Sequence, residues 1–439
     1  MSPKDDPKTI FGWCMYDWAN SAYMTTAVGL RPVYFAKVVV GEGGVRFAGT
    51  RYHADTLWAF MVGTADVLAF IAAPVLGAIA DFSAAKRRFL LSFAYTGALF
   101  TLLLYACRSG DVARTMAFFI VAQFAYVSAN VFYDGFLPQV ASPERMDWVS
   151  GKGYSYGYVG GGLQFALALA LVAAHGYVGV SQETAMRLGI ASAGLWWAGF
   201  TLVTARRLRE EGAPEPLPAR YAGWSRWLAL VAVGLSRTLA TTRSAGRFRH
   251  LVLFLLAFMF YNDGIQTVIN LATTYGAVEL KLSAWALMGT LLVIQFVSTF
   301  GALLFGWLAG RMGTKRAIML SLVLWTGVVV YAYFMRSAAE FFALGMLVGV
   351  VLGGSQALSR SYFGSMVPEQ ASAEFYGFYT VFTKFSSIWG PFAFALIKQV
   401  TGSSRQAIVS LVVFFILGLL LLAVVDEAKA RQARTAMEF

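Results

Sequence analysis

The sequence predicts an all-α membrane protein whose twelve transmembrane helices form two halves of six. Three observations predict this class: the composition, the spacing of apolar segments and an internal repeat. Hydrophobic residues make up 58% of the 439 residues, charged residues make up 13%, and the mean hydropathy is +0.62. A soluble globule carries about a quarter charged residues, so this composition indicates a polytopic membrane protein.

Twelve apolar segments are long enough to cross a bilayer, whose hydrocarbon core of about 30 Å requires roughly 20 apolar residues per helix. We expect the membrane helices near residues 10–36, 56–80, 88–107, 115–138, 152–174, 187–205, 251–275, 284–308, 316–335, 340–363, 375–398 and 406–425. A further apolar stretch from Trp224 to Leu239 is too short to span and contains Arg226 and Arg237. We expect it to lie in the membrane interface as an amphipathic helix.

Basic residues gather in the loops on one side of this arrangement. When the loops are assigned alternately to two sides, the side that holds the amino terminus also holds Lys86, Arg87, Arg88, Arg206, Arg207, Arg209, Arg311, Lys315, Arg316, Lys429 and Arg431. By the positive-inside rule this side is cytoplasmic, so we expect a multi-pass protein of the cell's inner (plasma) membrane with both termini in the cytoplasm. The same loops account for the net charge of +12, and we expect no nucleic-acid partner.

An internal repeat divides the chain into two parallel copies. The segment Gly77–Arg88, after the second predicted helix, recurs as Gly306–Arg316 after the eighth, 229 residues later. Between the copies lies a segment with three prolines and nine arginines. We therefore expect a first six-helix bundle at 1–205, a cytoplasmic linker at 206–250 and a second six-helix bundle at 251–439. Repeated halves are a plan of secondary transporters, which bind their substrate between the halves.

Ionisable and amide side chains inside the predicted helices are the candidate binding residues. A charge in hydrocarbon is costly, so such a group faces protein or a water-filled cavity. Residues three or four apart share one face of a helix, which predicts polar stripes on the first and seventh helices. We predict a substrate site formed by Asp17, Asn20, Asn262, Asp263, Gln266, Asn270, Gln356 and Lys384.

A zwitterionic solute requires one anionic and one cationic subsite. We expect Asp17 or Asp263, on facing helices of the two halves, to act with Lys384 in the middle of the eleventh helix. Asp17, Asp66 and Asp263 are also candidates for proton coupling, because a membrane carboxylate can carry the proton that drives transport. For each of them a purely structural hydrogen-bonding role is the alternative.

Two further features of the predicted helices suit alternating access. Asp134 and Arg360 lie towards the cytoplasmic ends of their helices, where they either pair to close a gate or contact the substrate. Gly390 and Pro391 interrupt the eleventh helix, and because proline removes a backbone donor, it permits a bend there.

The Gly-x-x-x-Asp-x-x-x-x-Lys-Arg run at 77–87 resembles the signature of the major facilitator superfamily. That resemblance implies the major facilitator fold and a cytoplasmic gate locked by Asp81, Lys86 and Arg87; the second copy has Gly310 in place of the aspartate. A narrower resemblance links the chain to the unknown major facilitator family, which includes fungal autophagy-related vacuolar amino-acid effluxers. It rests on Tyr16–Tyr23, Phe136–Pro138, Gly157–Gly161, Gln356–Phe363 and Glu374–Tyr379.

Other classes of protein lack their motifs in this chain. There is no phosphate-binding loop for an ATP-driven pump, and the two cysteines and three histidines form no metal-ligand spacing. We expect neither an enzyme nor a bound metal or cofactor. The prediction is a monomeric secondary transporter of a small polar or zwitterionic, amino-acid-like solute, driven by protons or sodium, with export implied by the family resemblance. An amphipathic or lipid-like substrate, or a transport-inactive scaffold or sensor, are the alternatives.

Overall fold

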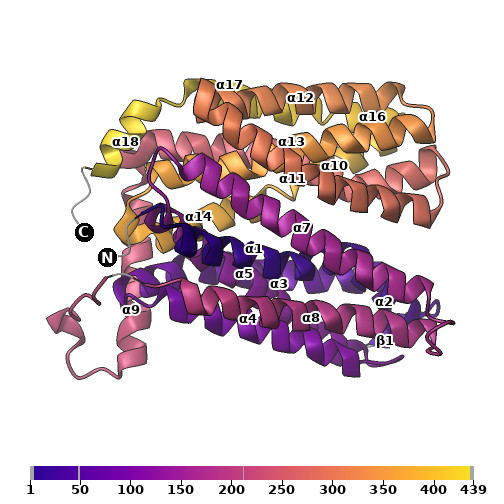
Figure 1. The fold of residues 1–439 in the computed structure, drawn as a ribbon, viewed down its shortest axis with the longest axis horizontal. Coiled ribbons are helices and arrows are strands. Elements are labelled where there is room, and N and C mark those ends of the chain that lie inside the picture. Colours follow the sequence, from indigo (N-terminus) through magenta and orange to yellow (C-terminus); the bar gives the residue numbers. More distant parts are fainter. Residues whose placement is uncertain (1–3, 48–49, 211, 436–439) are drawn as a thin grey trace.

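Most of the chain forms long helices that run side by side along one axis, in a computed structural model that describes residues 4–47, 50–210 and 212–435 (Figure 1). The predicted all-α membrane class is therefore confirmed. Within this described part, eleven helices are long and apolar enough to cross a membrane. Helix α1 (Pro7–Gly29) is not among them, because polar residues such as Asp17 and Asn20 lower its hydropathy. It nevertheless runs through the first bundle against α7 and α8, and we count it as the twelfth span.

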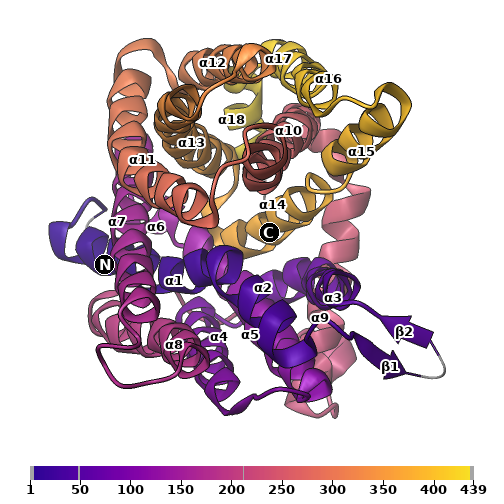
Figure 2. The same ribbon diagram turned by 90° about the vertical axis from the view of Figure 1, so that its right-hand side faces the viewer.

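The first bundle contains all helices that precede the linker. They are α1, α2 (Arg31–Tyr34), α3 (Ala54–Phe82), α4 (Lys86–Leu103), α5 (Val112–Gly135), α6 (Leu137–Val140), α7 (Met146–Ala173) and α8 (Gln182–Arg207). A π-helical stretch, Phe35–Val40, extends α2. The loop before α3 carries an antiparallel hairpin of β1 (Val45–Phe47) and β2 (Thr50–Tyr52), which the sequence did not predict and which projects from the bundle in Figure 2.

The second bundle follows linker helix α9 (Arg226–Arg243). Its helices are α10 (Arg249–Glu279), α11 (Ala284–Met312), α12 (Thr314–Phe334), α13 (Ala338–Met366), α14 (Ser372–Phe385), α15 (Trp389–Thr401), α16 (Ser404–Val409) and α17 (Val412–Val424), and α18 (Glu427–Thr435) ends the described chain. The predicted eleventh helix is thus broken at residues 386–388, just before Gly390 and Pro391. Lys384 consequently lies in the last turn of α14, and its expected place in mid helix was wrong.

Local capping residues set where several of these helices begin. The Asp6 side chain accepts the Thr9 N–H at 2.8 Å, and Pro7 follows it at the first helical position of α1. Ser337 and Glu340 form a reciprocal capping box at the start of α13. Such side chains satisfy N–H groups that have no partner within the helix. They hold the helix ends in place, and with them the polar residues of the first turns.

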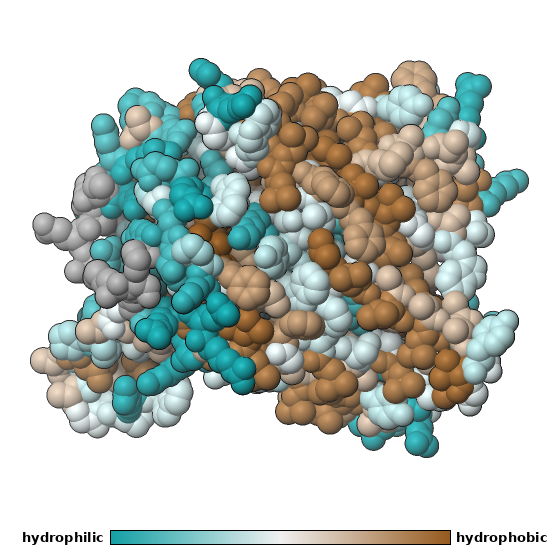
Figure 3. All heavy atoms as spheres, in the orientation of Figure 1, coloured by the Kyte–Doolittle hydropathy of each residue, from teal (hydrophilic) through white to brown (hydrophobic). Residues whose placement is uncertain are grey.

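The first and last described residues lie at one end of the molecule, which we call the terminal end; the opposite end is the far end (Figure 1). The linker and α9 also lie at the terminal end, where α9 runs crosswise to the membrane helices (Figure 1). Between the two ends the face seen in Figure 3 is broadly apolar, while hydrophilic residues gather at the terminal end. This is the surface of a multi-pass membrane protein.

Candidate functional site

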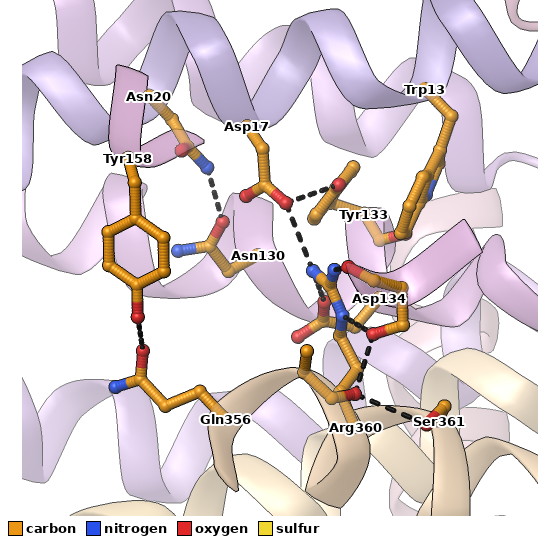
Figure 4. Close-up of polar contacts among 12 residues, drawn as sticks. Trp13, Asp17, Asn20, Asn130, Tyr133, Asp134, Tyr158, Gln356, Arg360 and Ser361 are labelled. Atoms are coloured by element: carbon orange, nitrogen blue, oxygen red, sulfur yellow. Dashed lines mark hydrogen bonds and ion pairs between the residues drawn. The ribbon is translucent and has the colours of Figure 1, made fainter. Parts of the chain in front are cut away.

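Arg360 of α13 extends from the second bundle into contact with side chains of the first bundle (Figure 4). Its Nη1 lies 3.2 Å from Asp17 Oδ2 of α1 and 3.2 Å from Asp134 Oδ1 of α5. Its Nε and Nη2 donate to the hydroxyl and the carbonyl oxygen of Ser150 at 3.0 and 2.9 Å. The Tyr133 hydroxyl donates to the same Asp17 oxygen at 2.6 Å. We call Arg360, Asp17, Asp134, Tyr133 and Ser150 the Arg360 cluster.

The sequence around the Arg360 cluster leaves room for this insertion. A Cβ at Gly153 of α7 would lie 2.9 Å from an Arg360 nitrogen and 2.7 Å from the Trp13 ring. Only glycine therefore allows α7 to approach this closely. The guanidinium lies 4.1 Å from the centre of the Tyr154 ring and 4.8 Å from that of Trp13, at distances typical of cation–π contacts. These contacts hold Arg360 in place across the interface between the bundles.

The Arg360 cluster contains one cationic side chain, Arg360, and two carboxylates, Asp17 and Asp134. Arg360 is 2% exposed and Asp17 is 8% exposed, so neither charge is screened well by solvent. A buried net negative charge is costly unless it is hydrogen-bonded, and the Tyr133 hydroxyl supplies one such bond to Asp17. The sequence placed Asp134 and Arg360 as a possible gate pair, and the structure brings them together. It also adds Asp17, which had been expected to face Lys384.

Two further polar pairs lie next to the Arg360 cluster (Figure 4). Asn20 Nδ2 donates to Asn130 Oδ1 at 2.6 Å, joining α1 to α5 within the first bundle. Tyr158 donates to Gln356 Oε1 at 2.6 Å, joining α7 to α13 across the two bundles. The predicted site residues Asn20 and Gln356 thus lie near Asp17, whereas the seventh-helix residues lie elsewhere.

Asp81 is the acidic residue of the first repeated motif, and it connects the bundles at the terminal end. Its carboxylate lies 3.2 Å from Lys86 Nζ, and it accepts the N–H groups of Ala373 and Glu374 at 3.3 and 2.8 Å. Lys86 also donates to the Ser372 hydroxyl at 3.0 Å. Asp81 therefore holds the amino-terminal end of α14 as well as the lysine.

Arg87 does not join this contact, which corrects the expected lock of Asp81 with both basic residues. Its side chain donates to the Ala205 carbonyl at the end of α8 instead. Its backbone N–H donates to Glu210 at 3.0 Å, and the Lys86 N–H donates to the same carboxyl group. Burial raises the pKa of the Glu210 carboxyl above its ordinary value. Arg87 thus ties α4 to the start of the linker, within the first half of the chain.

Lys384 pairs with Asp66 of α3, and not with Asp17 or Asp263 as expected. The Lys384 Nζ lies 2.7 Å from Asp66 Oδ1, and the side chains of the lysine and the aspartate are 21% and 27% exposed. Beside this pair, Phe70 contacts Phe385 edge to face, with ring centres 5.2 Å apart. The pair therefore joins α3 to the end of α14, at the break in the eleventh predicted helix.

Asp263 of α10 binds the amino-terminal end of α15. This helix end is present because the eleventh predicted helix is broken into α14 and α15. It accepts the N–H groups of Trp389 and Gly390 at 3.1 and 2.8 Å. Asn262 donates to the Ser386 hydroxyl in the same break. Asp263 therefore faces α15 and Asn262 faces the break, and the expectation that Asp263 lies opposite Asp17 was wrong.

The remaining two residues of the α10 stripe contribute little to this contact. Gln266 is half-buried and Asn270 is exposed, and neither makes a hydrogen bond to the described residues.

The second repeated motif makes a different contact, centred on a residue that the sequence reasoning missed. Lys315 donates to the carbonyl groups of Ala423 and Val425 at 2.8 and 2.7 Å, inside its own bundle. Across the interface, Asp147 in the first turn of α7 accepts the hydroxyls of Thr314 and Ser361. Its place in the first turn of a membrane helix, opposite the second motif, is the signal that would have found it.

Polar contacts between the bundles are confined to one part of the molecule. Among the described residues, the hydrogen bonds and ion pairs that join the bundles lie between the terminal end and the level of Asp66 and Lys384. The bundles are therefore held together at the terminal end, with the Arg360 cluster between that end and the Asp66–Lys384 pair.

A separate cavity of about 80 Å³ lies inside the second bundle towards the far end. Its lining is apolar and includes Val268, Ile294, Phe341 and Leu352. None of the candidate site residues borders it, so it belongs to the packing of one bundle and not to the interface.

Comparisons with known proteins place the whole chain in one family. Residues 5–435 match the family described as vacuole effluxer Atg22 like. A relative in Bacillus subtilis (strain 168), an uncharacterized MFS-type transporter named YxiO, is 36% identical over 423 residues, which cover 94% of each chain. Autophagy-related protein 22-1 of Aspergillus clavatus is 30% identical over 310 residues, which cover 66% of this chain and 50% of the fungal protein.

Solved structures share the fold at low sequence identity. The human organic anion transporter MFSD10 (TETRAN) has a TM-score of 0.67 and 14% identity, with coverage of 95% of this chain and 100% of that chain. The proton:xylose symporter XylE has a TM-score of 0.69 and 12% identity, with 94% of both chains covered. These likenesses establish the major facilitator fold that the sequence predicted.

Proposed function

This chain belongs to the Atg22-like family of the major facilitator superfamily, and from that premise we propose that it moves an amino-acid-like zwitterion by proton-coupled alternating access, in the direction of export. It is a secondary transporter of a small solute and not an enzyme. The observation that carries the proposed substrate class is the ion pair between Asp66 and Lys384.

The Asp66–Lys384 pair presents the two charges that a zwitterion needs. Its members come from different bundles and lie 2.7 Å apart, and both side chains are partly exposed. A solute with an ammonium and a carboxylate group can replace each partner of this pair, because it offers a cation to Asp66 and an anion to Lys384. The solute then connects α3 to α14 as the ion pair does in its absence. This proposal replaces the assignment of Asp17 or Asp263 as the anionic subsite.

Proton coupling is proposed for the Arg360 cluster. Opening of the terminal end requires Arg360 to leave two carboxylates of the first bundle, Asp17 and Asp134. A proton on one carboxylate weakens its attraction for the guanidinium, so protonation favours opening. Asp263 is then a structural residue, since its two oxygens already accept backbone N–H groups of α15.

We also propose the orientation and the organisation of the chain. The terminal end carries the arginine-rich linker, and the positive-inside rule assigns such an end to the cytoplasm. Location in the plasma membrane and a monomeric state are proposed with it. The boundaries at residues 205/206 and 250/251 remain our proposed division into two bundles and a linker.

The substrate proposal is tested with purified protein in liposomes, by uptake and exchange of radiolabelled amino acids. Lys384→Gln should weaken binding of the free amino acid more than of its carboxyl-amidated analogue, by roughly 1–3 kcal/mol, as for a charge-assisted hydrogen bond. Asp66→Asn should weaken binding of the free amino acid more than binding of its amino-blocked analogue. Lys37→Gln and Asp55→Asn make the same chemical changes at exposed positions and should bind like the unchanged protein.

Other outcomes of the same assay would replace the proposal. Equal loss for free and blocked analogues would remove Asp66 and Lys384 from solute recognition. Flux of lysolipids without flux of amino acids would favour an amphipathic substrate. A protein that moves neither solute nor protons would be a scaffold or sensor. For the coupling proposal, Asp17→Asn should abolish uphill transport but retain exchange, and unchanged uphill transport would exclude Asp17.

A further inference from the structure

Helix α9 rests against the flank of the first bundle near the terminal end. Ala229, Val233 and Gly234 are buried on the face that packs there. A Cβ at Gly234 would lie 2.6 Å from the Ile79 side chain and 3.0 Å from the Val75 carbonyl oxygen, so α9 and α3 are in close contact. Val75 lies about two turns inside the end of α3. Helix α9 is therefore at the depth of a membrane interface, beside the bundle and not below it.

The opposite face of α9 exposes a continuous apolar stripe. Its residues follow the three- and four-residue spacing of one helix face, starting in the turn before α9: Trp224, Trp227, Leu228, Val231, Leu235 and Leu239. Trp227 is 75% exposed and Leu228 is 61% exposed. A helix with apolar residues on both the packed and the outer face requires a second apolar partner.

Unpaired arginines lie at both ends of the stripe. Arg226 begins α9, Arg243 ends it and Arg247 follows, and all three are exposed and have no carboxylate partner among the described residues. Arg237, by contrast, pairs with Glu215 and stacks on Phe82. Tryptophan and leucine on one face with flanking arginines are typical of helices that lie in the interface of an anionic leaflet.

Helix α9 also touches both sides of the closed terminal end. Arg237 stacks on Phe82 at the end of α3, with 5.1 Å from the guanidinium to the ring centre. Arg237 and Thr241 face the buried Glu374 of α14, in the second bundle. Since Asp81 of α3 binds the Glu374 N–H, α9 covers the junction that the first repeated motif closes.

We propose that α9 is a lipid-binding strap. Its apolar stripe inserts into the leaflet at the terminal end, and Arg226 and Arg243 bind the phosphates of anionic lipids. Lipid bound in this way holds α9 where it contacts both α3 and α14. Anionic lipid therefore favours the closed terminal end, because a ligand that binds one state better shifts the equilibrium towards it.

The position of the stripe is tested by fluorescence quenching. Leu235→Cys, labelled with a bimane fluorophore in liposomes, should be quenched more by spin-labelled lipid than by aqueous iodide. Ala213→Cys, in the exposed linker, is the matched control and should show the reverse order. The native Cys14 and Cys107 are buried, so labelling of the unchanged chain gives the background. Quenching of Leu235→Cys by iodide alone, or its disulfide cross-linking to a second copy, would overturn the lipid assignment.

The lipid preference is tested by thermal unfolding in detergent with added phosphatidylglycerol or phosphatidylcholine. Phosphatidylglycerol should raise the Tm by ~2–4 °C more than phosphatidylcholine. Arg226→Gln with Arg243→Gln should lose most of this difference, whereas Arg336→Gln, exposed before α13, should retain it. Phosphatidylglycerol should also slow alkylation of Ala371→Cys, a position buried at the terminal end. The same lipid response in the double variant, or faster alkylation, would refute the strap.

Discussion

In the first repeated motif, Asp81 of α3 makes the contact between the bundles by binding α14. In the second motif the equivalent residue of α11 is Gly310, which has no carboxylate, and Asp147 of α7 makes the contact instead. The first contact combines an ion pair to Lys86 with two backbone N–H groups of the second bundle. The second contact contains only the hydroxyls of Thr314 and Ser361, because Lys315 binds carbonyl groups of its own bundle. In the first motif the carboxylate is part of the motif itself, whereas in the second it belongs to the helix across the interface.

The carboxylates that join the bundles at these contacts consequently come from the first bundle in both motifs. The same holds for Asp17 and Asp134 at Arg360, and for Asp66 at Lys384. The second bundle supplies the guanidinium of Arg360 and the ammonium of Lys384. Neutral hydrogen bonds run in both directions, since Tyr158 and Ser150 of the first bundle donate to Gln356 and to the Ala357 carbonyl. The exposed pair of Lys4 with Glu369 has the reverse polarity. The carboxylates of these ion pairs therefore lie mainly on the first bundle, and their cationic partners from the other bundle lie on the second.

The largest effect is expected for Asp81→Asn, which leaves Lys86 buried beside a neutral side chain. Loss of one partner of a buried ion pair costs about 3–5 kcal/mol of folding stability, because Asp81 and Lys86 both lie in the first bundle. The closed terminal end is also destabilised, because the N–H groups of Ala373 and Glu374 lose a charged acceptor. Faster alkylation of Ala371→Cys would report the opening. Asp55→Asn, an exposed control, should leave the rate unchanged. Equal rates in all three proteins would mean that Asp81 does not hold the gate.

A smaller effect is expected for Asp147→Ala, because this change leaves no cation unpaired. The hydroxyls of Thr314 and Ser361 lose their acceptor in a part-buried site, which costs at most roughly 1–3 kcal/mol. Thermal unfolding measures the loss of stability, and the alkylation rate of Ala371→Cys measures gate opening. A cost as large as that of Asp81→Asn would contradict the difference between the two motifs.

Gly310→Asp restores the acidic residue of the second motif and should change little. A Cβ at this position meets no atom within 4 Å, and replacing glycine inside a helix changes stability by about 0.5–1 kcal/mol. Gly77→Ala is the steric contrast, since its Cβ would lie 2.2 Å from the Ala373 carbonyl oxygen. Severe destabilisation by Gly310→Asp, measured as Tm, would show that the second motif is as closely packed as the first.

The smallest effect is expected for Glu210, which accepts the N–H groups of Lys86 and Arg87 of the first motif. Burial raises the pKa of its carboxyl group above the ordinary value of 4.5. A raised pKa means that folding favours the neutral form. The stabilising contribution is therefore present below pH 4.5 and is lost as the pH rises through the raised pKa. Glu210→Gln should flatten the Tm profile over this window, and an unchanged profile would exclude the group.

Much of the fold was predictable, because its signals are local in the chain. Apolar length predicted the positions of the membrane helices, and the repeat predicted two related halves. The resemblance to the major facilitator signature also predicted that Asp81 pairs with Lys86. The break at residues 386–388 was indicated by Gly390 and Pro391, although its place next to Lys384 was not.

Partner choice among the buried charges was decided by tertiary structure alone. Asp17 and Arg360 are 343 residues apart in the chain, and only the packing of α7 against α13, at Gly153, brings them together. Lys384 binds Asp66 because α14 ends, at the break, beside α3. The same break leaves the N–H groups of Trp389 and Gly390 without helical partners, and Asp263 accepts both. By itself the sequence determined which side chains are too polar for lipid, since hydration cost is a property of each residue. Which of them meet depends on helix crossings, and these are set by contacts between distant segments.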